Sequence, residues 1–400
     1  MSDRSTKRES GFSLLEMTIA VALGTLVLGA AVQLYTQAVG ATWTVSQRAE
    51  MQQDFRAASD ILIKDLSQAG AGLGQGAQIP LPSNIATPEY GCDQTKCYLG
   101  ASNTSPGTYP LQGATPTLYG LIPGYTLGPT LSSNPNATDA VTVVYSDTTF
   151  YLNCYQATVS ALGYVTFGPA TAPVLGVVPT FPPTNCLPSG VATPQAVNDT
   201  MVGLTPGDLV LMTLNGTQVV GEVTAGTITT GTNAVGTTYI VPFANADALN
   251  MNQTGTGATA GLNGAALNAT GANPVRLLVI TYYIDKTVTP ARLMRQISGH
   301  TPMPITDGIA YMKFSYDLYN DTTNAPAVGC QNPGASTDVC VAGTSTGLNP
   351  TDITKINILH MAMNSTLHGT SGYQGLDLET SISARDLTYS NKYPICTTGC

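Results

Sequence analysis

Charged residues are scarce in this chain, and basic residues are scarcer than acidic ones. Only 10% of the 400 residues are charged, and the formal net charge is −9. Lys and Arg form no cluster beyond residue 11, so the chain lacks the basic patch with which proteins bind nucleic acid. It has three histidines and neither an H-E-x-x-H nor a G-x-S-x-G motif, which are patterns of hydrolytic enzymes. We therefore predict that the protein is not an enzyme and holds no cofactor or metal. On this interpretation three residues are ordinary surface or core histidines: His300, His360 and His368.

Charge and proline are also absent from one long stretch near the N-terminus. After Glu16 the next charged residue is Arg48, and no proline occurs in residues 12–79. Residues 17–34 are almost wholly apolar, and about 20 such residues form a helix that crosses the ~30 Å hydrocarbon core of a membrane. Three basic residues precede this run: Arg4, Lys7 and Arg8. Positive charge on the near side predicts a cytoplasmic N-terminus and an extracytoplasmic head.

Glu16 is the unusual residue of this stretch, because a carboxylate at the mouth of a membrane span is costly unless it is paired or reaches water. A snorkelling side chain at the end of the helix is the simplest interpretation. However, Gly11, Phe12 and a Glu four residues later, with Lys7 and Arg8 before them and an apolar helix after them, resemble the type IV prepilin signal. The resemblance implies that a membrane peptidase cleaves between Gly11 and Phe12 and that the new N-terminus is methylated. It also implies that Glu16 pairs with the ammonium group of Phe12 in a neighbouring subunit.

The helix is expected to continue well beyond the membrane. We predict a leader at 1–11, a helix at 12–75 and an extracytoplasmic head at 76–400, with 12–36 in the membrane or filament core and 37–70 amphipathic. Apolar residues recur at steps of three and four along one face: Met51, Phe55, Ala58, Leu62, Leu66 and Ala69. Charged residues are predicted to occupy the other faces: Glu50, Asp54, Arg56, Asp60, Lys64 and Asp65. The apolar face is expected to lie on the head.

The head has the composition of a β-rich domain, since Gly and Pro are plentiful and Thr, Ser and Asn are frequent in the expected loops. The predicted strands are residues 140–145, 150–159, 209–214, 217–223, 275–284, 292–297, 308–318, 353–363 and 378–387. The predicted loops are 77–139, 169–194, 244–272 and 320–350. Asn215-Gly216 between two strands indicates a hairpin turn. We therefore predict an α+β fold, in which a long transmembrane and amphipathic N-terminal helix packs on an antiparallel head with long loops.

The eight cysteines all lie in the head, and their even number fits an oxidising compartment. Zinc ribbons use two Cys-x-x-Cys pairs, and the spacings here differ, so disulfides are the better interpretation. Neighbours in sequence close the smallest loops, which predicts four bridges: Cys92–Cys97, Cys154–Cys186, Cys330–Cys340 and Cys396–Cys400. Other pairings of eight cysteines stay open.

Six short segments of the head, in their order along the chain, resemble the PilW-like minor pilins. They are Gly207-Asp208-Leu209-Val210, then Tyr282-Tyr283-Ile284 with Arg292-Leu293-Met294-Arg295, then Thr306-Asp307-Gly308-Ile309 with Phe314-Ser315-Tyr316, and last Ser383-Ala384-Arg385-Asp386-Leu387. The last segment has Asp386 where an Asn is commoner in that family.

The two resemblances imply a structural subunit of a type IV pilus that serves filament initiation or tip assembly. Its expected partners are the prepilin peptidase, the inner membrane before assembly, other pilins through the N-terminal helix, and a tip adhesin. A head of about 325 residues is about 50 Å across, whereas packed helices lie about 8–10 Å apart. Identical heads of that width would crowd along a shaft, so we expect a minor subunit at the tip, exposed at the cell surface and with a role in adhesion. The alternatives are a pseudopilin of a type II secretion or DNA-uptake system and a signal-anchored binding protein that never polymerises.

Overall fold

The computed structural model describes residues 11–73, 77–81, 117–131, 134–160, 163–169, 182, 186–214, 216–245, 247–252, 262, 271–320, 324–333, 338–345, 347–364 and 375–387. Some of the predicted features lie outside these ranges. They are the basic residues Arg4, Lys7 and Arg8, the pairs Cys92–Cys97 and Cys396–Cys400, and His368.

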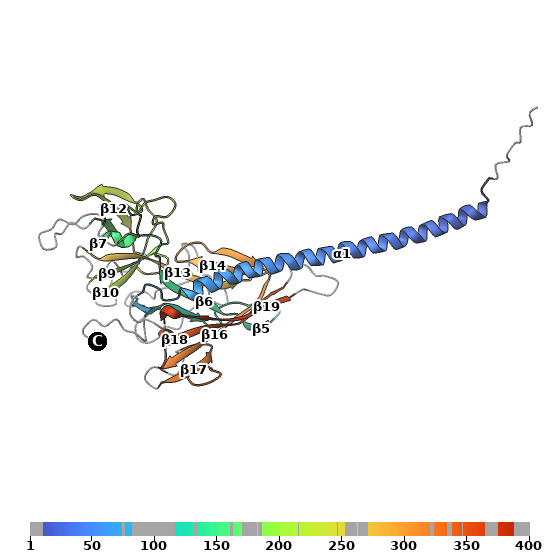
Figure 1. Cartoon of the computed structure of the whole chain (residues 1–400). Coiled ribbons are helices and arrows are strands. Elements are labelled where there is room, and N and C mark those ends of the chain that lie inside the picture. Colours follow the sequence, from blue (N-terminus) through green and yellow to red (C-terminus); the bar gives the residue numbers. More distant parts are fainter. Residues whose placement is uncertain are drawn as a thin grey trace, which may run out of the picture.

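One helix, α1 (Leu14–Ser67), dominates the N-terminal part of the chain (Figure 1). It is shorter than the predicted 12–75 at both ends. Ser13 caps the first turn, and Gln68 is the C-cap. Gly72 follows with a φ of +71°, and a Cβ on it would lie 1.8 Å from the Ser146 hydroxyl. Only glycine fits this sharp exit from the helix.

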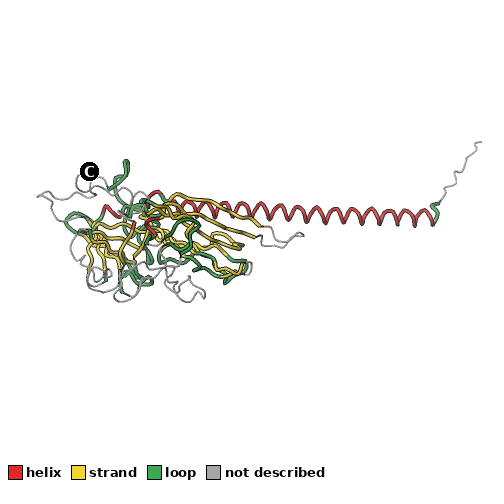
Figure 2. The backbone as a smooth tube through the Cα atoms, turned by 90° about the horizontal axis from the view of Figure 1, so that it is seen from below, coloured by secondary structure: helices red, strands yellow, loops and turns green. Residues whose placement is uncertain are grey.

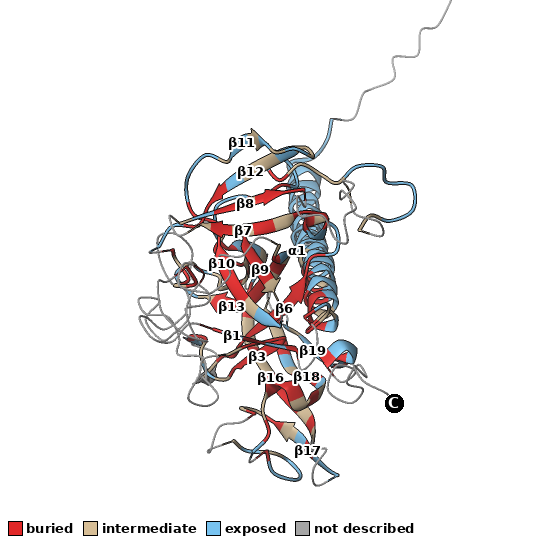
Figure 3. Cartoon of the chain, turned by 90° about the vertical axis from the view of Figure 1, so that its left-hand side faces the viewer, coloured by how far each residue is buried: buried red, intermediate tan, exposed pale blue. Residues whose placement is uncertain are grey.

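The two parts of α1 have different surroundings. The residues before Met51 are exposed, apart from two that are half-buried, and the first buried residue is Met51 itself (Figure 3). At 1.5 Å per residue the helix is about 80 Å long, and about 55 Å of it protrudes from the head (Figure 2). The predicted apolar stripe from Met51 to Ala69 is buried, whereas residues 37–50 of the predicted amphipathic part do not dock.

The central sheet of the head has seven antiparallel strands built around β13. Its members are β3 (Leu121–Gly124), β6 (Ala140–Ser146), β9 (Leu209–Leu214), β10 (Thr217–Glu222), β13 (Asn273–Asp285), β14 (Arg292–Ile297) and β15 (Met303–Asp307). Strand β13 pairs with β9, β6 and β14 along successive, overlapping stretches. Strands β9 and β10 form the predicted hairpin, and Gly216 has the positive φ that such a turn needs.

A second antiparallel sheet has the order β17-β16-β18-β19. Its strands are β16 (Ile309–Asn320), β17 (Ala325–Cys330), β18 (Ile353–Asn364) and β19 (Gly375–Ser383). The docked part of α1 contacts β15, β18 and β19, so α1 and both sheets share one core.

Asp139 joins the two sheets. Its backbone N–H donates to the Met312 carbonyl at 3.0 Å, and its carboxylate accepts the Phe314 N–H at 3.0 Å. The Lys313 ammonium lies 2.6 Å from the same carboxylate. Burial raises the pKa of Asp139, and the nearby Lys313 lowers it only in part. The two sheets are therefore joined by a buried ion pair between Asp139, next to the start of β6, and Lys313 on β16.

A third sheet has the order β11-β12-β8-β7 and contributes to a second hydrophobic core. Its strands are β7 (Gln156–Ser160), β8 (Tyr164–Gly168), β11 (Thr229–Thr232) and β12 (Thr237–Pro242). The short helix η2 (Leu152–Cys154) precedes it. This sheet lies at the end of the head opposite to the protruding helix (Figure 1). The sequence patterns predicted neither β11 nor β12.

The shortest elements complete the fold and correct several predictions. They are β1 (Gln78–Pro80) paired with β2 (Thr117–Tyr119), β4 (Thr130–Leu131) paired with β5 (Asn134–Ala137), and η4 (Pro350–Asp352). The predicted loop 77–139 thus contains strands, and the predicted loop 320–350 contains β17. The last predicted strand ends at Ser383, and residues 385–387 are helical. Strands of two to four residues are too short to show a periodic pattern. The predicted fold class is confirmed, since a long apolar helix precedes antiparallel sheets with long loops.

Candidate functional site

The first turn of α1 holds Glu16 in a capping box. The Ser13 hydroxyl accepts the backbone N–H of Glu16 at 3.2 Å, and the Glu16 carboxylate accepts the backbone N–H of Ser13 at 3.1 Å. Ser-x-x-Glu before an apolar run is the sequence form of this motif, although we did not predict it from the sequence. A carboxylate has about four acceptor positions. Glu16 can therefore cap its own helix and still form an ion pair with a cationic group of another chain.

The N-terminal part of α1 presents apolar side chains that no described part of the chain covers. Phe12 is 90% exposed, and the large apolar residues from Leu14 to Leu34 are exposed as well. Among the described residues, α1 is the one helix long and apolar enough to cross a membrane. An apolar surface of this size needs lipid or other helices around it.

The C-terminal end of α1 is anchored to the head through Asp65. Its carboxylate accepts the Arg295 Nε–H at 2.8 Å, the Tyr282 hydroxyl at 2.5 Å and the Tyr145 hydroxyl at 3.5 Å. These partners come from β14, β13 and β6. The prediction that Asp65 lies away from the face of α1 that docks on the head is wrong, because the residue is 4% exposed. Its partners lie between 80 and 230 positions away along the chain, so the local pattern could not reveal them.

Burial and the neighbouring charges set the protonation states of the three residues that contact Asp65. Burial raises the pKa of Tyr282 and of Tyr145, and the negative charge of Asp65 raises both further. Both hydroxyls therefore stay protonated and donate. Burial alone would lower the pKa of Arg295, but its hydrogen bonds to Asp65 and Tyr282 and its electrostatic interactions with both residues together outweigh burial, and the pKa is raised. The anchor thus places a cation and two neutral donors around one carboxylate.

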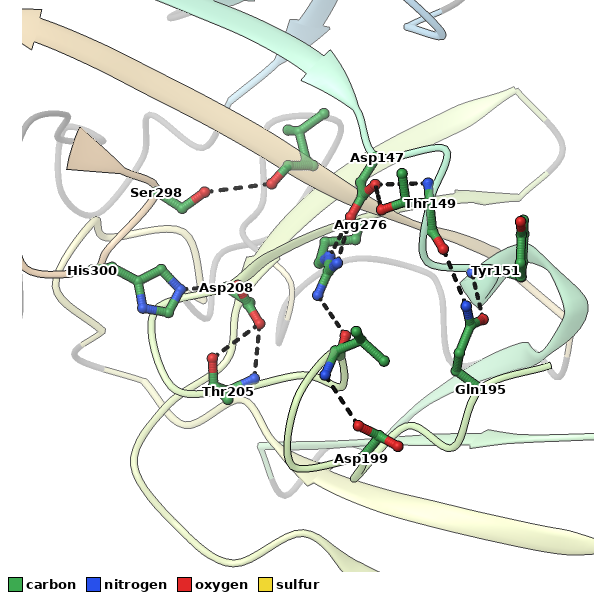
Figure 4. Close-up of polar contacts among 12 residues, drawn as sticks. Asp147, Thr149, Tyr151, Gln195, Asp199, Thr205, Asp208, Arg276, Ser298 and His300 are labelled. Atoms are coloured by element: carbon green, nitrogen blue, oxygen red, sulfur yellow. Dashed lines mark hydrogen bonds and ion pairs between the residues drawn. The ribbon is translucent and has the colours of Figure 1, made fainter. Parts of the chain in front are cut away.

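A second polar network holds the segment 195–208 on the central sheet (Figure 4). Arg276 donates from Nε to Asp147 at 2.8 Å and from Nη1 to the Val202 carbonyl at 2.9 Å. Burial alone would raise the pKa of Asp147, but hydrogen bonds from Thr149 and Arg276 lower it below its usual value. An open hollow of about 480 Å³ adjoins Asp147 and Tyr151. The ion pair beside it is already satisfied internally, so the role of this network is structural.

The histidines and cysteines of the described part are placed as follows. His300 Nε2 lies 2.9 Å from an Asp208 carboxylate oxygen, and His360 Nδ1 lies 2.9 Å from an Asp377 carboxylate oxygen. The structure contains two of the four predicted disulfides, Cys154–Cys186 and Cys330–Cys340.

Comparison with known families locates one match, at the end of the chain that carries the capping box. Residues 6–32 match the family model of the prokaryotic N-terminal methylation motif. The chain carries the N-terminal motif of type IV prepilins and pseudopilins. Proteins that carry this motif are pilin-like proteins of the kind that prepilin peptidase processes, and they are typically structural and not enzymatic. A search of curated proteins and a search of solved structures gave no match.

Proposed function

We propose that this pilin-like protein is a minor pilin that acts in the initiation or at the tip of a type IV pilus. One observation carries the proposal. The helix that bears the methylation motif is exposed before Met51, almost wholly apolar over residues 17–34, and docked from Met51 onward. This division suits a subunit that stands in the inner membrane and then transfers its free apolar part into a helical filament core, while its head stays rigidly attached.

Processing comes first in the proposed pathway. Gly11 and Phe12 are exposed and precede the first helical turn, so a peptidase can reach the bond between them. Cleavage there would make Phe12 the N-terminus, one residue before the helix cap, and methylation would follow. Mass spectrometry of the mature protein tests this step, and we expect N-methyl-Phe12. Gly11→Val should accumulate the full-length precursor, and a normally cleaved product from that variant would refute the proposed site.

Assembly would then depend on Glu16. In the separate chain its carboxylate caps the helix through Ser13. In a filament the same carboxylate would also accept the Phe12 ammonium of a neighbour. An ion pair in a low-dielectric helical core is sensitive to register, because a mispaired carboxylate stays buried and unsatisfied. The pair would therefore select one helix position among many that are equally apolar.

The shape and charge of the head support the proposed place at the tip. The sheet β11-β12-β8-β7 adds a second core at the end far from the protruding helix (Figure 1), which makes the head too bulky for close stacking. The net charge of −9 adds repulsion between stacked copies. Quantitative mass spectrometry of sheared filaments tests the placement. We expect far fewer copies than of the most abundant pilin, and a ratio near one would contradict a minor role.

The competing functions make different predictions. A pseudopilin would appear with a secretion or DNA-uptake machine and be absent from surface pili. A signal-anchored binding protein would keep an uncleaved N-terminus. Both outcomes are read from the same fractionation and mass spectrometry.

A further inference from the structure

Three potential metal ligands meet on the outer face of β18 and β19. They are His360 on β18 and Asp377 and Glu379 on β19. One ligand atom of each lies within 4.8 Å of the others. His360 Nδ1 lies 2.9 Å from the Asp377 oxygen and 3.7 Å from the Glu379 oxygen. We propose that these residues form a binding site for one divalent transition-metal ion, with Zn²⁺ as the reference ion.

A β-bulge brings the three side chains together. Ile358 pairs with Thr380, and Met361 pairs with Leu378, so two residues of β18 stand opposite the single residue Glu379. Ile358 and Met361 are both buried although they are three positions apart. The extra residue lies between the inward-facing Ile358 and Met361, and it lets the His360 side chain stay on the outer face of the sheet. β-bulges commonly re-aim a side chain in this way.

The alternation of β19 supplies the two carboxylates on that same outer face. Leu376 and Leu378 are partly buried against the core. Because successive side chains of a strand point to opposite faces, Asp377 and Glu379 both point outward. Asp377 and Glu379 lie 17 and 19 positions after His360 in the chain, so no short sequence motif reveals the site.

The spacing of the ligand atoms suits a shared ion. Bonds from Zn²⁺ to His nitrogen and carboxylate oxygen are about 2.0–2.2 Å long, which places two ligands of a tetrahedral ion about 3.4 Å apart. The observed separations of 2.9 and 3.7 Å bracket this value. The His360, Asp377 and Glu379 side chains are 48%, 50% and 70% exposed. They can thus rotate by the small amount required, and water can fill the remaining coordination positions.

The local charges favour a cation. Asp377 and Glu379 are like charges on one face of a strand, and a divalent ion held between them would offset both. Lys313 stands opposite His360 on β16 but is already paired with Asp139. A protonated His360 could form an ion pair with Asp377 and leave Glu379 unneutralised, which is the rival explanation of the cluster. An imidazole ligand selects Zn²⁺, Co²⁺ or Ni²⁺ over Mg²⁺ and Ca²⁺.

The test titrates the full-length protein, purified in detergent, with Co²⁺ and follows the visible absorption of the bound ion. We expect saturation at one ion per chain, displacement by Zn²⁺ and no displacement by a large excess of Mg²⁺. His360→Gln should abolish the signal, and Asp377→Asn or Glu379→Gln should weaken binding by about tenfold or more. The matched control is His300→Gln, which removes the other His–Asp contact, with Asp208, and should bind as the unmodified chain does.

Each contrary result is decisive. Absence of saturable binding, or equal binding by His360→Gln, would overturn the proposal and leave a plain ion pair. An equal loss in His300→Gln would show non-specific binding. A measurement without any substitution guards against variants that fail to fold. Zn²⁺ should slow the chemical modification of His360 by diethyl pyrocarbonate but not that of His300, as peptide mass spectrometry reports. Equal rates with and without Zn²⁺ would also refute the site.

Discussion

The anchor at Asp65 gives the most direct test of how the helix is held on the head. Asp65→Ala would leave Arg295, which is 19% exposed, without its carboxylate, and Tyr282 without its acceptor. Breaking a buried ion pair from one side costs about 3–5 kcal/mol, and since Arg295 can turn partly toward water we expect about 3 kcal/mol. For a head of this size that corresponds to a fall in melting temperature of about 5–10 °C.

The assay is thermal unfolding of the full-length protein in detergent, followed by near-ultraviolet circular dichroism. This signal reports mainly on the tyrosines of the head, because the single tryptophan, Trp43, lies on the exposed part of α1. Amide hydrogen exchange in the docked part of α1 should rise in the same variant, since the anchor and the apolar stripe hold that part together.

Two comparisons make the anchor prediction refutable. Asp60→Ala changes an exposed carboxylate of the same helix and should alter stability by no more than about 0.5 kcal/mol. The double change Asp65→Leu with Arg295→Met removes both members of the pair and should recover only part of the loss, because the buried Tyr282 hydroxyl still lacks its acceptor. If Asp65→Ala is as mild as Asp60→Ala, the apolar stripe alone holds the helix and the reasoning about the anchor is wrong.

Four further predictions follow from single sites. Glu16→Ala should leave cleavage and membrane insertion intact but reduce incorporation into filaments, as immunoblots of sheared pili would show; unchanged incorporation would make Glu16 a mere interfacial residue. The pKa of Asp147 is lowered in the folded state, so its contribution to stability is present above about pH 4 and is lost as the pH falls through the lowered pKa. Asp147→Asn should therefore destabilise the head at pH 7 and differ less from the unmodified chain in acid denaturation. Replacing Cys330 and Cys340 by Ser opens a short loop and should cost about 2–3 kcal/mol in denaturant titrations, an effect that a reductant should reproduce. Gly72→Ala should cost about 1–2 kcal/mol or more, because of the positive φ and the close Ser146 hydroxyl, and a neutral result in thermal unfolding would contradict the sharp exit of the chain from α1.

The sequence by itself determined the parts of this protein that depend on local physics. The almost wholly apolar residues 17–34 call for an apolar environment whatever the head looks like, and a continuous helix is the way to satisfy the backbone there. The long strands follow from similar local patterns. Residues 292–297 are predicted and observed as β14, and residues 275–284 lie inside β13. The first turn is local as well, since Ser13 and Glu16 are three positions apart, and the capping box could have been predicted.

Only the tertiary structure decided which polar residues are buried and which surface side chains meet. The pattern on α1 placed Asp65 away from the docked apolar face, but it is buried, with Arg295, Tyr282 and Tyr145 reaching it from three strands. Asp139 is the last residue of the predicted loop 77–139, yet it joins two sheets. The second core, around β7, β8, β11 and β12, also escaped prediction.

The same physical reason underlies all of these differences. Helix propensity, hydrophobic periodicity and capping act between residues a few positions apart, so the sequence shows them directly. The cost of burying a charge depends on partners that the fold supplies from far along the chain. Asp65 and Arg295 are 230 positions apart, and no local pattern relates them. His360, Asp377 and Glu379 become neighbours only because two strands pair in a register with a bulge.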